Sequence, residues 1–163
     1  MKKNIPLKKN QRLAMKLYID TSVFGGFFET EFQLWTRKLV DQIFDGEFTA
    51  VISDITLAEL EPAPQNVRDL ADRIISENAE FVTAGQADKN LAEKYLKEKI
   101  VTTKFRSDAM HIAIATINKV DVLTSWNFKH IVNLNRIRQY NSVNLKYGYS
   151  MVEIRSPMEI VEI

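Results

Sequence analysis

The chain has 163 residues, of which 45% are hydrophobic, and this suits one globular domain with a substantial core. It contains no cysteine, which excludes a disulfide framework and a thiolate metal site. No apolar run approaches the roughly 20 residues of a membrane span, and no apolar signal segment opens the chain. We therefore take a cytoplasmic location as the default expectation.

The net charge of +1 is unevenly distributed along the chain. Residues 1–14 contain five basic side chains and no acidic one, which leaves 17 of the 22 basic residues against all 21 acidic ones. We expect residues 1–14 to be a basic, flexible leader and residues 15–163 to form a single domain. The mildly acidic charge of that domain does not by itself attract nucleic acid.

Apolar runs and apolar residues at helical spacing predict alternating strands and helices along the chain. In chain order, we expect strand 17–19, helix 29–44, strand 48–52, helices 55–60 and 67–75, strand 80–83, helices 91–100 and 107–118, strand 120–124, helix 127–134 and strand 149–154. The glycine pair at 25–26 is expected to interrupt regular structure after the first strand. This alternation predicts a three-layer α/β domain with a mainly parallel sheet.

Polar residues follow three of the predicted strands, and another lies at the start of a predicted helix. Asp20 ends the first strand, Glu59 lies about one helical turn beyond the second, Asp108 opens an apolar helix, and Asn127 follows the fourth strand. Because the carboxyl ends of parallel strands share one edge of a sheet, these side chains are expected to meet there.

Each of these residues also has a purely structural explanation. Asp20 and Asn127 are suitable helix N-caps, Glu59 suits a helix surface, and Asp108 complements a helix N-terminus. Clustered acids near a core repel one another and are costly to desolvate. A bound divalent cation removes this energetic cost. Oxygen ligands without cysteine favour Mg²⁺ or Mn²⁺ over Zn²⁺. We expect His111 and His130 to be structural, although His111 follows Asp108 by one turn and could face the same pocket.

Four motifs in this order resemble the PIN-domain family, the metal-dependent ribonuclease fold that includes the VapC toxins of toxin–antitoxin pairs. They are Tyr-Ile-Asp20-Thr-Ser, Leu-Ala-Glu59-Leu, Ser-Asp108-Ala-Met-His-Ile-Ala and Leu-Thr-Ser-Trp-Asn127-Phe-Lys-His-Ile. The resemblance covers essentially everything from Met15 onward. It implies an α/β/α domain with about five parallel strands, and an acidic pocket that binds Mg²⁺ or Mn²⁺ and cleaves RNA.

The same resemblance assigns roles to individual residues. It implies that Asp20, Glu59 and Asp108 bind the metal, with hydroxyl groups of Thr21, Ser22 and Ser125 close by. Asn127 occupies a catalytic position at which many active members carry an acid. This departure leaves an alternative open, a PIN fold that binds RNA without cutting it. The family also implies a homodimer and, if the chain is a toxin, a cognate antitoxin, whereas the short apolar runs predict no membrane partner.

The stretch from Val122 to Val152 contains no acidic residue and interleaves basic with aromatic side chains. Basic groups hold phosphates, and aromatic rings stack on unpaired bases. We therefore predict that RNA contacts this stretch and the nearby serines, through Ser22, Ser125, Trp126, Lys129, Arg136 and Arg138. The alternative is that the aromatic residues belong to the core and the basic ones only maintain solubility.

Overall fold

The computed structural model of the chain describes residues 13–161. Its elements are β1 (Met15–Ile19), α1 (Thr21–Gly26), α2 (Gln33–Phe44), β2 (Phe48–Ser53), α3 (Asp54–Leu60), α4 (Gln65–Asn78), β3 (Ala79–Val82), α5 (Gln86–Lys97), a 3₁₀ turn (Thr103–Phe105), α6 (Arg106–Ile117), β4 (Val122–Thr124), α7 (Leu134–Lys146), β5 (Glu153–Arg155) and α8 (Pro157–Ile160). Most of the predicted leader, residues 1–12, lies outside this described part.

The strands form one five-stranded parallel sheet in the order β3-β2-β1-β4-β5. β1 lies at its centre, with Tyr18 opposite Val51 of β2 and Leu123 of β4. Crossover helices connect the parallel strands, because strands that run in the same direction need a long connection that returns the chain to the starting edge of the sheet. The predicted fold class, an α/β/α sandwich around about five parallel strands, is confirmed.

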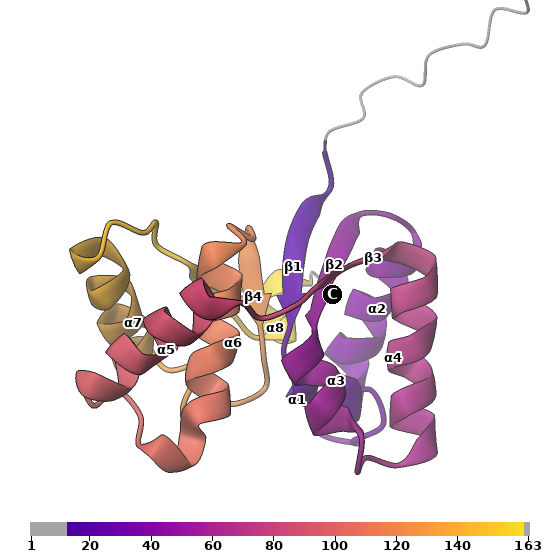
Figure 1. Cartoon of the computed structure of the whole chain (residues 1–163). Helices are drawn as coiled ribbons and strands as arrows, with labels where there is room; N and C mark the ends of the chain where they lie inside the picture. Colours follow the sequence, from indigo (N-terminus) through magenta and orange to yellow (C-terminus); the bar gives the residue numbers. More distant parts are fainter. Residues whose placement is uncertain (1–12, 162–163) are drawn as a thin grey trace, which may run out of the picture.

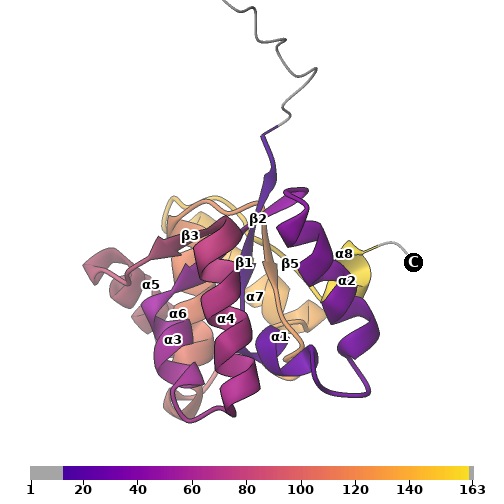
Figure 2. The ribbon, with the colours of Figure 1, turned by 90° about the vertical axis from the view of Figure 1, so that its right-hand side faces the viewer.

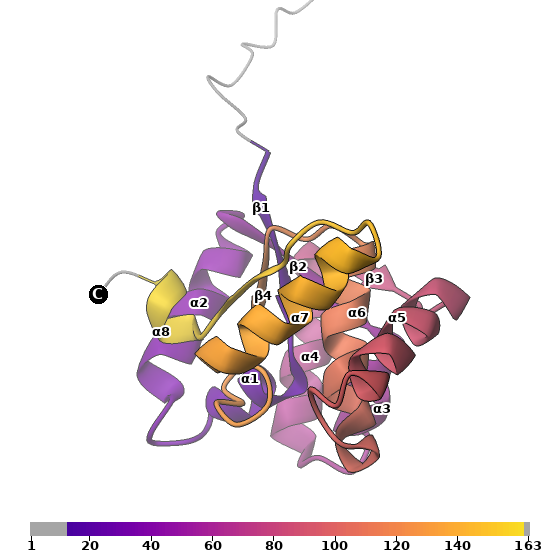
Figure 3. The same cartoon turned by 90° about the vertical axis from the view of Figure 1, so that its left-hand side faces the viewer.

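Successive side chains of each strand point to opposite faces of the sheet, and this divides the core into two halves. Leu17 and Ile19 of β1 face a cluster built with α1, α2, α4 and α8, whereas Tyr18 faces a cluster built with α5, α6 and α7. Successive side chains of a strand point to opposite faces, so a short apolar strand contributes to both clusters. The sheet lies between these two helical layers (Figure 1), and each layer covers it when viewed from its own side (Figures 2 and 3).

One predicted helix is absent from the structure, and the long helix that follows it was not predicted. The segment predicted as helix 127–134 is a hydrogen-bonded turn in which both Ile131 and Val132 donate to the carbonyl of Asn127. The helix begins later, at Leu134, where the side chain of Asn133 accepts from the N–H of Arg136 and caps α7. α7 was not predicted because most of its residues are polar.

The glycine pair interrupts regular structure as predicted, but only after a short helix. Gly25 and Gly26 are the last two residues of α1, which Asp20 caps. A Cβ added to Gly26 would lie 2.7 Å from the indole ring of Trp126, so glycine permits this close approach. Separately, none of the helices within residues 13–161 is long and apolar enough to cross a membrane.

Candidate acidic site

Asp20 lies at the carboxyl end of the central strand. Its backbone N–H donates to the carbonyl of Thr124 at 3.0 Å, which aligns the ends of β1 and β4. Its Oδ2 accepts hydrogen bonds of 2.7 Å from the hydroxyls of both Ser22 and Ser125. The same oxygen caps α1 through the N–H of Ser22, so Asp20 is both a helix cap and a buried carboxylate at the strand ends.

Glu59 enters the same region from the last turn of α3. Its Oε1 lies 2.6 Å from Nε2 of His111, and the same nitrogen lies 3.5 Å from Oδ1 of Asp20. His111 is fully buried, whereas the Glu59 side chain is 33% exposed. Burial alone would lower the pKa of His111, but Tyr18, Glu59 and Asp20 outweigh it and hold the pKa well above its usual value.

Asp108 lies in the first turn of α6 and is partly buried. Burial is the main reason that the pKa of its carboxyl rises to about 6, and the negative charges of Asp20 and Glu59 add to the rise. His111 and a hydrogen bond from Asn127 act in the opposite direction. The carboxylates of Asp20 and Glu59 are therefore close enough to disfavour the ionisation of Asp108.

Asn127 belongs to this cluster in a different way from the acids. Its Oδ1 accepts the backbone N–H of His130 at 2.9 Å, which fixes the turn after β4. Its backbone N–H donates to Ser125 Oγ at 2.9 Å, and its side-chain amide lowers the pKa of the nearby Asp108. Asn127 thus serves as a turn cap and as a contact of Asp108 at the same time.

The chemistry of these side chains fits a hard divalent cation, because the available donors are carboxylate and hydroxyl oxygens. The raised pKa of Asp108 indicates negative charge that the neighbouring protein groups do not fully balance. However, within residues 13–161 no three or more His, Cys, Asp or Glu side chains are arranged to hold one ion together. In this arrangement the Glu59 carboxylate is held by Nε2 of His111, and the same nitrogen lies 3.5 Å from Oδ1 of Asp20.

The structure separates the residues that were predicted to contact RNA. Ser22 and Ser125 lie in the acidic cluster, where both hydroxyls donate to Asp20. Trp126 is only 7% exposed, stacks on Phe32 and donates from its indole to Thr36, so its ring belongs to the core.

The predicted basic contacts also differ from one another. Lys129 is exposed beside the cluster, whereas Arg136 is partly buried and donates to the carbonyl of Ile100. Arg138 is exposed on α7, and it lines a cavity of about 380 Å³ with Glu98 that contains none of the cluster's acids.

A small surface next to Asp108 and Asn127 combines aromatic and basic side chains. Phe128 is 47% exposed, and Phe105 stacks on His130 with ring centroids 4.0 Å apart. The ammonium groups of Lys104 and Lys129 lie 5.6 and 6.0 Å from the Phe105 ring. Sequence reasoning selected Trp126 and missed Phe105 and Lys104, because Phe105 and His130 come together only in the folded chain.

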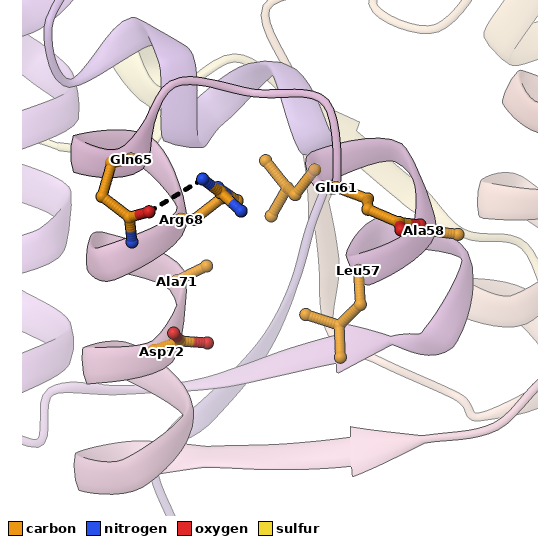
Figure 4. A pocket seen from close by; sticks show the side chains of 8 residues that line it. Leu57, Ala58, Glu61, Gln65, Arg68, Ala71 and Asp72 are labelled. Carbon is orange, nitrogen blue, oxygen red and sulfur yellow. Dashed lines mark hydrogen bonds between the residues drawn. The ribbon is translucent and has the colours of Figure 1, made fainter.

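Two cavities flank α3. One, of about 390 Å³, lies between Leu57 and Ala58 of α3, with Glu61 just after it, and the facing side of α4, as Figure 4 shows. The other, of about 450 Å³, includes Glu59 and Thr21 and therefore opens beside the acidic cluster. Leu60 lines both cavities, so α3 bears the catalytic candidate Glu59 and also forms a wall of two partly apolar cavities.

Comparisons with known proteins agree with the fold. No protein-family model matches the chain, and no curated protein matches it. Its structure is similar to a chain in the crystal structure of VapBC2 from Rickettsia felis bound to a DNA fragment from their promoter, with a TM-score of 0.57 and 15% sequence identity. The match covers 87% of this chain and 98% of that chain. This likeness shows a PIN-like fold.

Proposed function

We propose that the chain is a Mg²⁺- or Mn²⁺-dependent ribonuclease that hydrolyses RNA phosphodiesters at the cluster of Asp20, Glu59 and Asp108. The observation that carries this proposal is the convergence of three carboxylates at the strand ends, where burial and mutual repulsion raise the pKa of Asp108 to about 6. Such a cluster is costly without a cation. The PIN-like fold supports the same assignment.

Each residue of the cluster has a distinct task in this proposal. Ser22 and Ser125 occupy Oδ2 of Asp20 and leave its Oδ1 directed toward the cluster. Asp108 would supply the second carboxylate for the cation, and Glu59, which His111 holds, would complete the site. A bound divalent cation supplies neutralisation of the scissile phosphate and activation of water.

The surface formed by Lys104, Phe105, Phe128 and Lys129 supports single-stranded RNA as the substrate. The ammonium groups would contact phosphates, and the exposed ring of Phe128 would stack on an unpaired base. This surface borders Asp108 and Asn127, so a strand bound there would pass the acidic cluster.

The deciding experiment measures cleavage of a labelled, unstructured RNA with Mn²⁺. We expect Asp20→Asn and Asp108→Asn to lower the rate by at least about 100-fold, because each removes a metal ligand. Asp41→Asn, which changes an exposed acid on α2, is the matched control and should keep the wild-type rate. Equal rates for all four proteins would place the activity elsewhere.

A second candidate function is RNA binding without cleavage. It is favoured by Asn127, which bonds to its own turn where many family members carry an acid, and by the engagement of Glu59 with His111. Tight RNA binding with no turnover at millimolar Mn²⁺ would establish this alternative.

The proposal extends to a toxin with a cognate antitoxin. The structural neighbour is a VapBC2 assembly, and the two cavities beside α3 offer apolar walls with acidic rims that suit a segment with apolar and basic side chains. Inducing the chain in a bacterial host should arrest growth, and Asp20→Asn should abolish the arrest.

The predicted homodimer is tested by light scattering of the purified chain.

A further inference from the structure

A chain of buried hydrogen bonds connects the sheet to Glu59. Ser53 Oγ lies 2.7 Å from Tyr18 OH, and Tyr18 OH lies 2.7 Å from Nδ1 of His111. Nε2 of His111 then reaches Glu59 Oε1 at 2.6 Å. Ser53, Tyr18 and His111 are fully buried, and Ser53 also accepts from the N–H of Thr56 at the start of α3. This series of hydrogen bonds therefore begins at Thr56 and ends at Glu59 of the same helix, α3.

An ionised Glu59 carboxylate can only accept, so its 2.6 Å contact with His111 places a proton on Nε2. If the imidazole is neutral, this is its one ring proton, and Tyr18 donates to Nδ1. If the imidazole is charged, Nδ1 donates to Tyr18, whose hydroxyl turns to donate to Ser53. Both arrangements use hydroxyl groups that rotate freely, so Nε2 donates to Glu59 in either state.

We propose that His111 is a positioning residue, which holds the Glu59 carboxylate in one orientation within the acidic cluster. This inference rests on the proposed function for its catalytic meaning. Glu59 extends from a helix end with a side chain that is 33% exposed, and a free glutamate there would sample several rotamers. The hydrogen bond to a buried, oriented imidazole selects one of them and leaves Oε2 of Glu59 available.

A purely structural histidine would not need this arrangement. Tyr18 alone satisfies Nδ1, and a structural ring could direct Nε2 to a backbone carbonyl. Instead Nε2 is directed between two carboxylates of different elements, 2.6 Å from Glu59 and 3.5 Å from Asp20. The ring thus orders the edge of the sheet at which the acids meet.

The first measurement uses the metal-free protein and reports the mobility of Glu59 by NMR relaxation of its side-chain carbons. We expect a rigid Glu59 in the wild type and a mobile one in His111→Leu. His111→Gln should restore rigidity, because its amide NH₂ reaches about as far as imidazole Nε2. A Glu59 that stays equally rigid in His111→Leu would overturn the proposal.

Two tyrosine variants keep the test decisive if His111→Leu does not fold. Tyr18→Phe removes the hydroxyl that orients the ring and should loosen Glu59. Tyr95→Phe removes a hydroxyl that is buried in the same helical layer and bonds to Asn144, and it should leave Glu59 rigid. Equal effects of Tyr18→Phe and Tyr95→Phe would reduce the result to general destabilisation and reject the proposal.

The second measurement is RNA cleavage with Mn²⁺. We expect His111→Leu and Tyr18→Phe to lower kcat by about tenfold, roughly the loss of one hydrogen bond to a charged group, with KM nearly unchanged. His111→Gln should recover most of the loss. If the wild type cleaves no RNA, the proposed function fails, and the mobility of Glu59 still decides whether His111 positions it.

Discussion

The hydroxyl of Ser125 donates a 2.7 Å hydrogen bond to Oδ2 of Asp20, although the two residues are 105 positions apart. This bond links the ends of β1 and β4, and a second bond from Ser22 reaches the same oxygen. Two charge-assisted donors on one carboxylate fix its plane, which is a requirement for a preorganised ligand.

We predict that Ser125→Ala lowers the free energy of unfolding by about 1–2 kcal/mol, because it removes one donor from a buried carboxylate. Urea denaturation measures this change. Ser142→Ala, on the exposed face of α7, is the control and should be neutral. A neutral result for Ser125→Ala would mean that Ser22 alone satisfies Asp20.

Asp108 should make stability depend on pH in the absence of metal. Its pKa is about 6 in the folded chain, against 3.8 for the ordinary group, so the folded state binds more protons between these values. Stability therefore falls as the pH rises through this window. Asp108→Asn should raise the free energy of unfolding at pH 7 by about 1–2 kcal/mol after allowance for solvent screening, and the gain should vanish near pH 4. A gain that is equal at both pH values would contradict this account.

Asn127→Asp should tighten Mn²⁺ binding and destabilise the metal-free protein. The new carboxylate would still accept the N–H of His130, but it would place a negative charge beside Asp108, where the Asn127 amide now favours the ionised carboxylate. Calorimetric titration with Mn²⁺ and melting temperatures with and without the ion measure the two effects. Identical affinities would confine Asn127 to its role in the turn.

The double substitution Lys104→Ala/Lys129→Ala should weaken RNA binding and lower the slope of log affinity against log salt by about 1–2. The sequence predicted the same behaviour for Arg136→Ala/Arg138→Ala. We expect a smaller effect there, because Arg136 is engaged with the Ile100 carbonyl. Binding curves at several salt concentrations compare the pairs, and the opposite order would move the RNA path to α7.

Gly26→Ala should destabilise the fold by about 1–3 kcal/mol, because a methyl group would overlap the buried indole of Trp126. Gly25→Ala is the matched control in the same helix. Its added Cβ would meet only the flexible Glu29 side chain, at 3.1 Å, and should be nearly neutral. Thermal melts of both variants test whether the contact with Trp126 causes the difference.

The sequence predicted the alternation of strands and helices well, because apolar periodicity is a local property of the chain. The three residues Leu17, Tyr18 and Ile19 were enough to indicate a buried strand that ends at Asp20. The same local reasoning failed for α7. Its apolar positions Ile137, Tyr140 and Val143 do follow helical spacing, but the polar residues between them obscured the pattern.

The sequence by itself placed acidic residues after two buried strands and at the start of one apolar helix, and it predicted that they meet at one edge of a parallel sheet. Only the tertiary structure decided what each polar group bonds to. His111 is 52 residues from Glu59, and Trp126 is 90 residues from the hydroxyl of Thr36 that accepts its indole N–H. Such pairings depend on the order β3-β2-β1-β4-β5 and on the packing of helices against it, which no local pattern encodes.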